Sequence, residues 1–236
     1  MLKSQAGSAL IYIFIAVALL AGLLYAMNQE SRVNTNALSE ERASIIASEI
    51  IEKSNIFALA AHKLLLRGCD ETEISFENSL HPAAATHANA NSPIDNSCHV
   101  FHPSGGGISL ESISLSEDSL DTAWTAESHY GYIIFTNNTC VDGVGTGPPC
   151  TVPGRELLVW TSFIKESICE AINKKLGIDS IGGEDTSAAP FRGDFSNGSA
   201  KLIDVATVAN KPAGCVEDNA GPTLGSYVYF STIKAR

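Results

Sequence analysis

Residues 8–27 read SALIYIFIAVALLAGLLYAM, and no charged side chain lies between Lys3 and Glu30. A helix needs about 20 largely apolar residues to cross the hydrocarbon core of a bilayer. The apolar core of a cleaved secretory signal is usually shorter, roughly 7–15 residues. The stretch therefore predicts a transmembrane helix, and Lys3 in front of it favours an orientation with the N-terminus inside and the rest of the chain outside.

The helical pattern continues beyond this apolar stretch. Residues 28–66 contain no proline and no glycine, and Gly68 ends the pattern. Apolar residues recur there on one stripe of a helix, at Ile46, Ile50, Phe57 and Leu64. We expect one helix over 8–67, transmembrane over 8–27 and amphipathic over 28–67. A signal anchor followed by an unrelated helix is the alternative.

The N-terminal region resembles the type IV pilin superfamily, which includes minor pilins and the pseudopilins of type II secretion. The resemblance rests on a short leader that contains Lys3 and ends in Gly7, followed by an Ala-, Leu- and Ile-rich segment that continues into an amphipathic half. It covers roughly residues 1–67. It implies that residues 1–7 are a leader peptide, that prepilin peptidase cuts between Gly7 and Ser8, and that the same enzyme methylates the new amine of Ser8.

Two positions differ from the usual pattern of that family. Tyr12 stands at the fifth mature position, where most pilins carry a glutamate that balances the N-terminal ammonium of an adjacent subunit, and Ser8 stands where a large apolar residue is commoner. Subunits at a filament tip lack the glutamate, so the resemblance implies a tip-type subunit. The candidate filament-interface side chains are Leu10, Tyr12, Phe14, Val17 and Leu20.

Six cysteines follow the apolar stretch, at Cys69, Cys98, Cys140, Cys150, Cys169 and Cys215. An even number of cysteines in a region exported beyond a membrane indicates disulfides, although the sequence leaves the connectivity open. Pairing in sequential order is the arrangement we prefer: Cys69–Cys98, Cys140–Cys150 and Cys169–Cys215. The spacing CxxC does not occur, which disfavours a zinc ribbon or a thioredoxin-type centre.

The remaining chain, 68–236, is long enough for one globular domain with a hydrophobic core. Runs rich in β-branched and aromatic residues predict strands at 130–136, 156–161, 201–208 and 227–233. A second helix is predicted near 162–176, with lysines in its last turn and Gly177 at its end. The predicted fold class is α+β: a long N-terminal helix packed on an antiparallel β-sheet, with the additional helix and disulfide-closed loops, in a pilin-like extracytoplasmic domain.

Signatures of catalysis are missing from the sequence, which has no GxSxG, HExxH, Walker A or GxGxxG motif. We therefore expect a protein that is not an enzyme and has no catalytic or cofactor-binding residue. Five of the six histidines lie between His81 and His129, but they fall in a predicted surface loop where Cys98 is better used in a disulfide, so we expect no metal ligand. Calcium is the one ion that the acidic segments 116–121 and 182–185 would suit, although neither follows the EF-hand ligand order.

These features predict a structural minor pilin or pseudopilin that primes or caps an extracytoplasmic type IV pilus-like or type II secretion filament. The expected partners are other pilin or pseudopilin subunits, prepilin peptidase, the inner-membrane assembly platform, and the membrane itself through residues 8–27. The expected location is the bacterial inner membrane, single-pass, with the domain in the periplasm and later in a filament. The net charge of −11 disfavours nucleic-acid binding, which needs a basic surface. A membrane-anchored periplasmic binding or adhesion domain with an uncleaved anchor is the alternative, and an anchored hydrolase is a third class.

Overall fold

The structure is a computed structural model that describes residues 6–81, 87–145, 150, 155–184, 193, 201–219 and 223–236. In the N-terminal helix, side chains are described for residues 11–24 and 39–66. Internal contacts divide the chain into two units, Met1–Arg42 and Ala43–Arg236. The boundary falls inside the helix, because the helical residues after Arg42 contribute to the core of the second unit.

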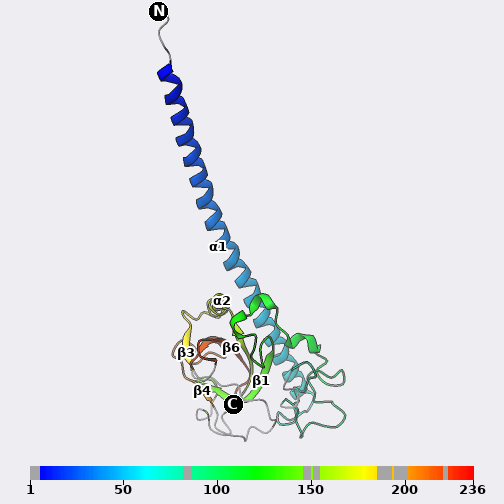
Figure 1. Ribbon diagram of the computed structural model, residues 1–236. Coiled ribbons are helices and arrows are strands. Elements are labelled where there is room, and N and C mark those ends of the chain that lie inside the picture. Colours follow the sequence, from blue (N-terminus) through cyan, green and yellow to red (C-terminus); the bar gives the residue numbers. More distant parts are fainter. Residues whose placement is uncertain are drawn as a thin grey trace, which may run out of the picture. The chain divides into compact units, whose positions relative to one another are not determined.

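The elements follow one another in the order shown in Figure 1. They are α1 (Ala6–Leu66), the short 3-10 helices η2 (Leu110–Ile113), η3 (Glu117–Ser119) and η4 (Thr122–Trp124), then β1 (Ile133–Val141), β2 (Glu156–Ile164), α2 (Glu166–Leu176), β3 (Gly182–Glu184), β4 (Lys201–Ile203), β5 (Ala213–Asp218) and β6 (Tyr227–Lys234). A glycine with positive φ follows each α-helix, Gly68 after α1 and Gly177 after α2. At these positions a residue without a side chain adopts the left-handed conformation that ends a helix.

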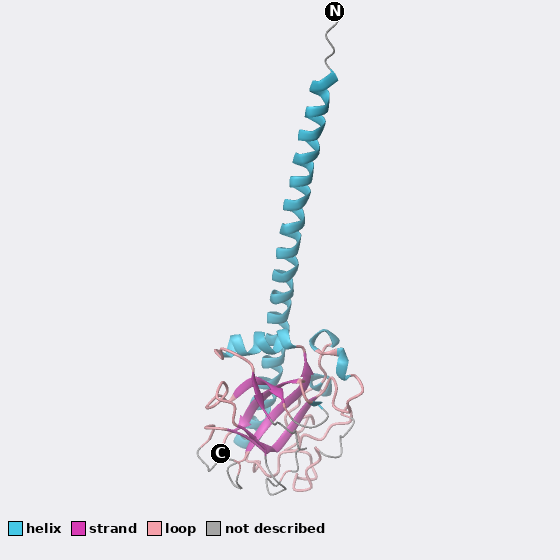
Figure 2. Cartoon of the chain, turned by 60° about the vertical axis from the view of Figure 1, so that its left-hand side comes forward, coloured by secondary structure: helices cyan, strands magenta, loops and turns pink. Residues whose placement is uncertain are grey.

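The six strands form one sheet in the order β3-β5-β6-β2-β1-β4, seen as a single layer in Figure 2. Its four central strands pair antiparallel, whereas the short edge strands β3 and β4 pair parallel with β5 and β1. The predicted antiparallel sheet is therefore wrong, and the sheet is mixed. The physical reason is that neither edge strand is joined to its partner by a tight hairpin turn, which is the connection that favours antiparallel pairing.

The predicted membrane span is contradicted as well. Where the structure describes side chains, in residues 11–24 and 39–66 of α1 and in α2, no helix has the length and apolar character needed to cross a membrane. This finding overturns the predicted transmembrane half at 8–27 and the predicted single-pass location in the inner membrane.

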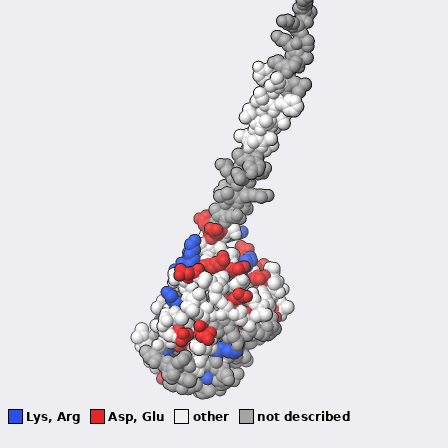
Figure 3. Space-filling view, turned by 90° about the vertical axis from the view of Figure 1, so that its left-hand side faces the viewer, with Lys and Arg blue, Asp and Glu red and all other residues white. Residues whose placement is uncertain are grey.

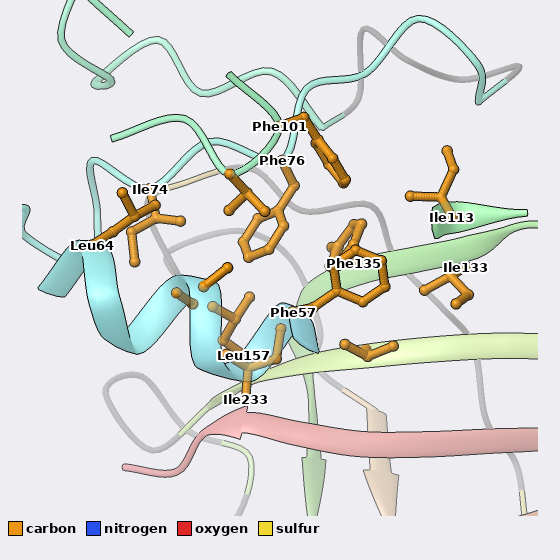
Figure 4. Packing of buried hydrophobic residues seen from close by; sticks show 14 residues of the cluster. Phe57, Leu64, Ile74, Phe76, Phe101, Ile113, Ile133, Phe135, Leu157 and Ile233 are labelled. Atoms are coloured by element: carbon orange, nitrogen blue, oxygen red, sulfur yellow. The ribbon is translucent and has the colours of Figure 1, made fainter. Parts of the chain in front are cut away.

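The main core of the second unit lies between α1 and one face of the sheet. Phe57 and Leu64 of α1 are fully buried against Phe135 of β1 and Leu157 of β2, with Ile233 of β6 beside them. The close-up in Figure 4 shows these side chains together with others from the loops before β1. The ring of Phe57 meets that of Phe135 edge-on, with 5.1 Å between the ring centroids. Edge-on aromatic pairs add about 0.5–1.5 kcal/mol to simple burial.

The other face of the sheet is also buried. Trp160 of β2 and Phe230 of β6 belong to a second cluster on that face, with Ile203 and Val208 from the region around β4. A third cluster joins α1, α2 and the sheet around Ile50, Ile172 and Tyr229. Because both faces are covered, β1 and β2 are buried along almost their whole length instead of alternating between buried and exposed residues.

Three disulfides are present in the sequential pairing, and the described cysteines include no free thiol. Cys69–Cys98 fixes the chain just after α1, Cys140–Cys150 closes the connection between β1 and β2, and Cys169–Cys215 joins α2 to β5. Each bridge links segments that a loop separates in the chain. They restrict the unfolded chain and so stabilise the second unit.

Candidate assembly interface

The described part of α1 in the first unit exposes an unusual amount of apolar surface. Ten large apolar side chains between residues 11 and 24 are each between 51% and 70% exposed: Ile11, Tyr12, Ile13, Phe14, Ile15, Val17, Leu19, Leu20, Leu23 and Leu24. Isolated exposed apolar side chains are ordinary, but a contiguous set of this kind marks an interaction surface. Burying one such side chain contributes about 1.5–3 kcal/mol. We call residues 11–24 the apolar segment.

Four of the five predicted interface residues have described side chains, and all four lie in this segment. Tyr12, Phe14, Val17 and Leu20 are all exposed, whereas the side chain of Leu10 lies outside the described residues. Successive helical residues are rotated by about 100°, so Tyr12 and Phe14 lie on nearly opposite sides of α1. The four described candidates therefore do not form one stripe. The apolar segment is exposed around its whole circumference, which suits several neighbours better than one.

The predicted processing positions, Gly7 and Ser8, lie at the beginning of α1 (Ala6–Leu66). Their side chains, and residues 1–5 of the predicted leader, are outside the described part of the chain. The structure therefore leaves cleavage between Gly7 and Ser8 as a prediction.

A second apolar surface on α1 was not found from the sequence. Ile45, Ile56, Leu59 and Leu66 are exposed within the second unit. Sequence periodicity places Ile45 beside the buried stripe, yet its side chain is more than half exposed. Ile56 and Leu59 lie three residues apart, which puts them on neighbouring positions of one helix face.

An acidic hollow of about 640 Å³ lies beside α2 in the second unit. Its walls include Glu166 and Glu170 of α2, Asp179, Glu217 of β5 and Tyr227 of β6. Burial, a hydrogen bond to Glu166 and the neighbouring carboxylates raise the pKa of Tyr227 to about 12. Figure 3 shows acidic side chains gathered on the globular unit. Among the described residues, four carboxylates and one cation, Lys174, thus line the hollow.

Three histidines form a cluster next to β1. The ring of His81 lies 4.7 Å from that of His87 and 5.3 Å from that of His129, measured between centroids. His81 and His87 are buried, although their sequence context predicts a surface loop. Burial, together with the nearby histidine rings, lowers the pKa of His81 to about 4 and that of His87 to about 3. Burial also lowers the pKa of His129, against the attraction of Glu127.

The histidines do not assemble a metal centre in the described parts of the chain, where no three His, Cys, Asp or Glu side chains are placed to hold an ion. The sequence pattern Cys98–His102 brings Cys98 into a disulfide and His99 next to Glu77 instead, with 3.7 Å between Nε2 of His99 and Oε2 of Glu77. Of the two acidic segments considered for calcium, 116–121 is described and forms η3 and its flanks. Residue 185 of the other segment is outside the described residues.

Glu156 is a buried carboxyl group that sequence reasoning missed. It begins β2, is almost completely buried, and its Oε2 accepts the backbone N–H of Val141 at 3.3 Å. Burial raises its pKa to about 7. Near neutral pH this carboxyl group therefore changes between its protonated and its charged form. The stability of the sheet consequently depends on pH.

Comparison of the chain with models of protein families, with curated proteins and with solved structures finds no match. The resemblance to the type IV pilin superfamily therefore depends on the N-terminal residues alone and stays a prediction.

Proposed function

We propose that the chain is a structural subunit, a minor pilin or pseudopilin that primes or caps a type IV pilus-like or type II secretion filament. In this role the apolar segment packs against the corresponding helices of neighbouring subunits. The observation that carries the proposal is the exposure of apolar side chains all around residues 11–24. A surface of that kind loses its contact with water when it enters a bundle of other apolar helices.

Several neighbours are favoured over one by the geometry of the segment. A helix that pairs with a single partner presents an apolar stripe and a polar opposite face. The apolar segment has no polar face among its described residues, since residues 11–24 comprise only apolar side chains and Gly22. The position of a helix at the centre of a filament fits this pattern, because neighbours surround it.

The proposal places the subunit at the end of a filament because of Tyr12. A repeating subunit, by the resemblance to pilins, needs a carboxylate at this position to pair with the N-terminal ammonium of the next subunit. Tyr12 is exposed and carries no carboxylate. The partners in this proposal are sister pilin or pseudopilin subunits, prepilin peptidase, and the assembly platform of such a machine.

The disulfides support a subunit that works outside a reducing compartment. Three bridges in one unit are typical of proteins that mature under oxidising conditions.

Site-specific photo-cross-linking tests this proposal. A benzophenone amino acid placed at Phe14 or Val17 of the full-length chain, expressed with its native neighbours, should give cross-links to the N-terminal helices of other pilin-like subunits, identified by mass spectrometry of the linked peptides. The matched control is the same group at Ile94, which is fully exposed in the second unit.

Cross-links from Phe14 to helices of pilin-like subunits, together with none of that kind from Ile94, are the expected result. Cross-links from Phe14 confined to proteins without such a helix would overturn the proposal. Equal cross-linking from both positions would do the same, because it would show that the apolar segment has no preferred partner.

A further inference from the structure

One face of α1 within the second unit combines exposed apolar side chains with two charges. Ile56 and Leu59 are 38% and 72% exposed, and the exposed residues Glu52 and Lys63 flank them along the helix. At about 100° per residue, the four side chains fall within a sector of about 60° around the helix axis. We call Glu52, Ile56, Leu59 and Lys63 the α1 face.

The two charges of the α1 face are unpaired within the described part of the chain. Neither Glu52 nor Lys63 takes part in a hydrogen bond or an ion pair with another described residue. The carboxylate one turn before Glu52, that of Glu49, acts on Lys53. The α1 face thus presents a carboxylate and an ammonium group, one on each side of an apolar centre.

The order of these residues makes the α1 face complementary to itself. The pair Glu52 and Lys63 and the pair Ile56 and Leu59 have the same midpoint, between residues 57 and 58. When a second copy of the helix lies antiparallel across a two-fold axis at that midpoint, each residue faces the other member of its pair. Ile56 then meets Leu59 and Glu52 meets Lys63, and each contact occurs twice. A parallel helix in the same register would place like charges opposite each other.

We propose that the α1 face binds a second copy of this chain, antiparallel and in this register, to form a symmetric dimer. The proposal does not depend on the filament function. Removal of Ile56 and Leu59 from water favours association, and the two ion pairs select the partner and the register more than they add affinity. The α1 face is small compared with the roughly 20–30 residues that each partner contributes to a standard interface, so the dimer is weak and depends on concentration.

Zero-length cross-linking of the full-length, oxidised chain tests the dimer, in a detergent that covers the apolar segment. A carbodiimide joins a carboxylate to an amine only where the two groups are in contact. Glu52 and Lys63 of one chain are about 16.5 Å apart along the helix, so an amide between them joins two chains. We expect a peptide in which Glu52 is linked to Lys63, and a covalent product that does not grow beyond the dimer. Glu170 and Lys174, exposed and four residues apart on α2, provide the positive control within one chain.

The cross-linked products also contain the results that would contradict the dimer. A linked Glu170–Lys174 peptide without a Glu52–Lys63 peptide would overturn the proposal. Covalent trimers and larger products through the Glu52–Lys63 link would also overturn it, because a head-to-tail contact continues in this way and a symmetric one does not. In cells that express the chain with its native neighbours, links from Lys63 to other proteins only would show that a different partner covers the α1 face.

Exchange of the two charges tests the register independently. E52K and K63E each place like charges opposite each other twice. The dissociation constant of the dimer, measured by sedimentation equilibrium in density-matched detergent, should therefore rise by about tenfold or more in either variant. An equimolar mixture of E52K and K63E restores both pairs of opposite charges and should associate as the wild type does, within about threefold. The double variant E52K/K63E should do the same, because its charges have only changed places.

K175E is the matched control for K63E. Lys175 is likewise an exposed lysine in the last turn of a helix, but in α2, so K175E should dimerise as the wild type does. Dimerisation of E52K that is as tight as that of the wild type would refute the proposed register. A mixture of E52K and K63E that stays monomeric, although both variants keep the circular dichroism of the wild type, would refute it as well.

Discussion

Phe57→Ala is the substitution that most directly tests whether the second half of α1 belongs to the globular core. The Phe57 side chain is fully buried, and its ring contacts Phe135 at 5.1 Å and Phe101 at 6.0 Å between centroids. Truncating a buried phenylalanine to alanine costs about 3–5 kcal/mol through lost burial and the cavity left behind. We expect a loss of about 4 kcal/mol in the free energy of unfolding, because two aromatic contacts disappear as well.

Leu59→Ala provides the matched control on the same helix. Leu59 is 72% exposed, so its truncation should change the free energy of unfolding by no more than about 0.5 kcal/mol. Urea unfolding of the disulfide-intact chain measures both values, with the fluorescence of buried Trp160 reporting on the second unit. The midpoint for Phe57→Ala should fall by about 2 M urea. A loss below about 1 kcal/mol, or equal losses for the two variants, would refute the packing of α1 on the sheet.

Three further predictions concern a disulfide, a buried carboxyl group and the apolar segment. Cys169→Ser opens the bridge between α2 and β5 and should lower the free energy of unfolding by about 2–5 kcal/mol; unchanged thermal melting would contradict this. Because burial raises the pKa of Glu156 to about 7, the protonated side chain makes a contribution to the free energy of unfolding that is fully present below about pH 4.5 and is lost as the pH rises through about 7. Glu156→Gln should remove this pH dependence. Relative to the wild type, this variant should therefore gain up to about 3 kcal/mol between pH 4.5 and 7.5, and a pH-independent difference would show that Glu156 titrates normally. Tyr12→Glu should reduce incorporation into filaments, measured by immunoblot of sheared filaments, because it puts an unpaired carboxylate among apolar helices; long homopolymeric filaments would argue against a tip position.

The elements with strong local patterns could be predicted from the sequence. Ile50, Phe57 and Leu64, spaced by seven residues, all proved to be buried on one face of α1. Helix α2 follows from its apolar periodicity, its lysine-rich last turn and Gly177. The hairpin between β1 and β2 follows from two runs of β-branched and aromatic residues. In each case the residues that predict the element lie within a few turns of helix or within neighbouring strands.

The parts that were missed depend on contacts between distant segments. Strand β3 consists of Gly182-Gly-Glu184 and has no strand propensity of its own, so its parallel pairing with β5 depends on the rest of the sheet. His87 is buried where its Nε2 accepts the backbone N–H of Phe135 in β1, a contact between distant segments that the sequence around His87 does not reveal. Glu156 is a charged residue at a strand end, where exposure is the usual expectation.

The candidate interface was found only in part. The sequence shows that residues 11–24 are apolar, but an apolar helix can enter lipid, a protein core or a bundle of other helices, and periodicity does not separate these environments. Exposure around the whole circumference became visible only with the structure. The expected span at 8–27 failed because length and composition were taken as sufficient evidence for a membrane environment.

Mass spectrometry of the mature N-terminus tests the central claim, that this chain is a pilin-like subunit, most directly. The chain, expressed with its native machinery, should begin at N-methylated Ser8, and Gly7→Val should leave a product that is heavier by the leader peptide. The two results together would place the chain among the substrates of a prepilin peptidase. A mature protein that retains residues 1–7, or a Gly7→Val variant that is processed normally, would contradict the account.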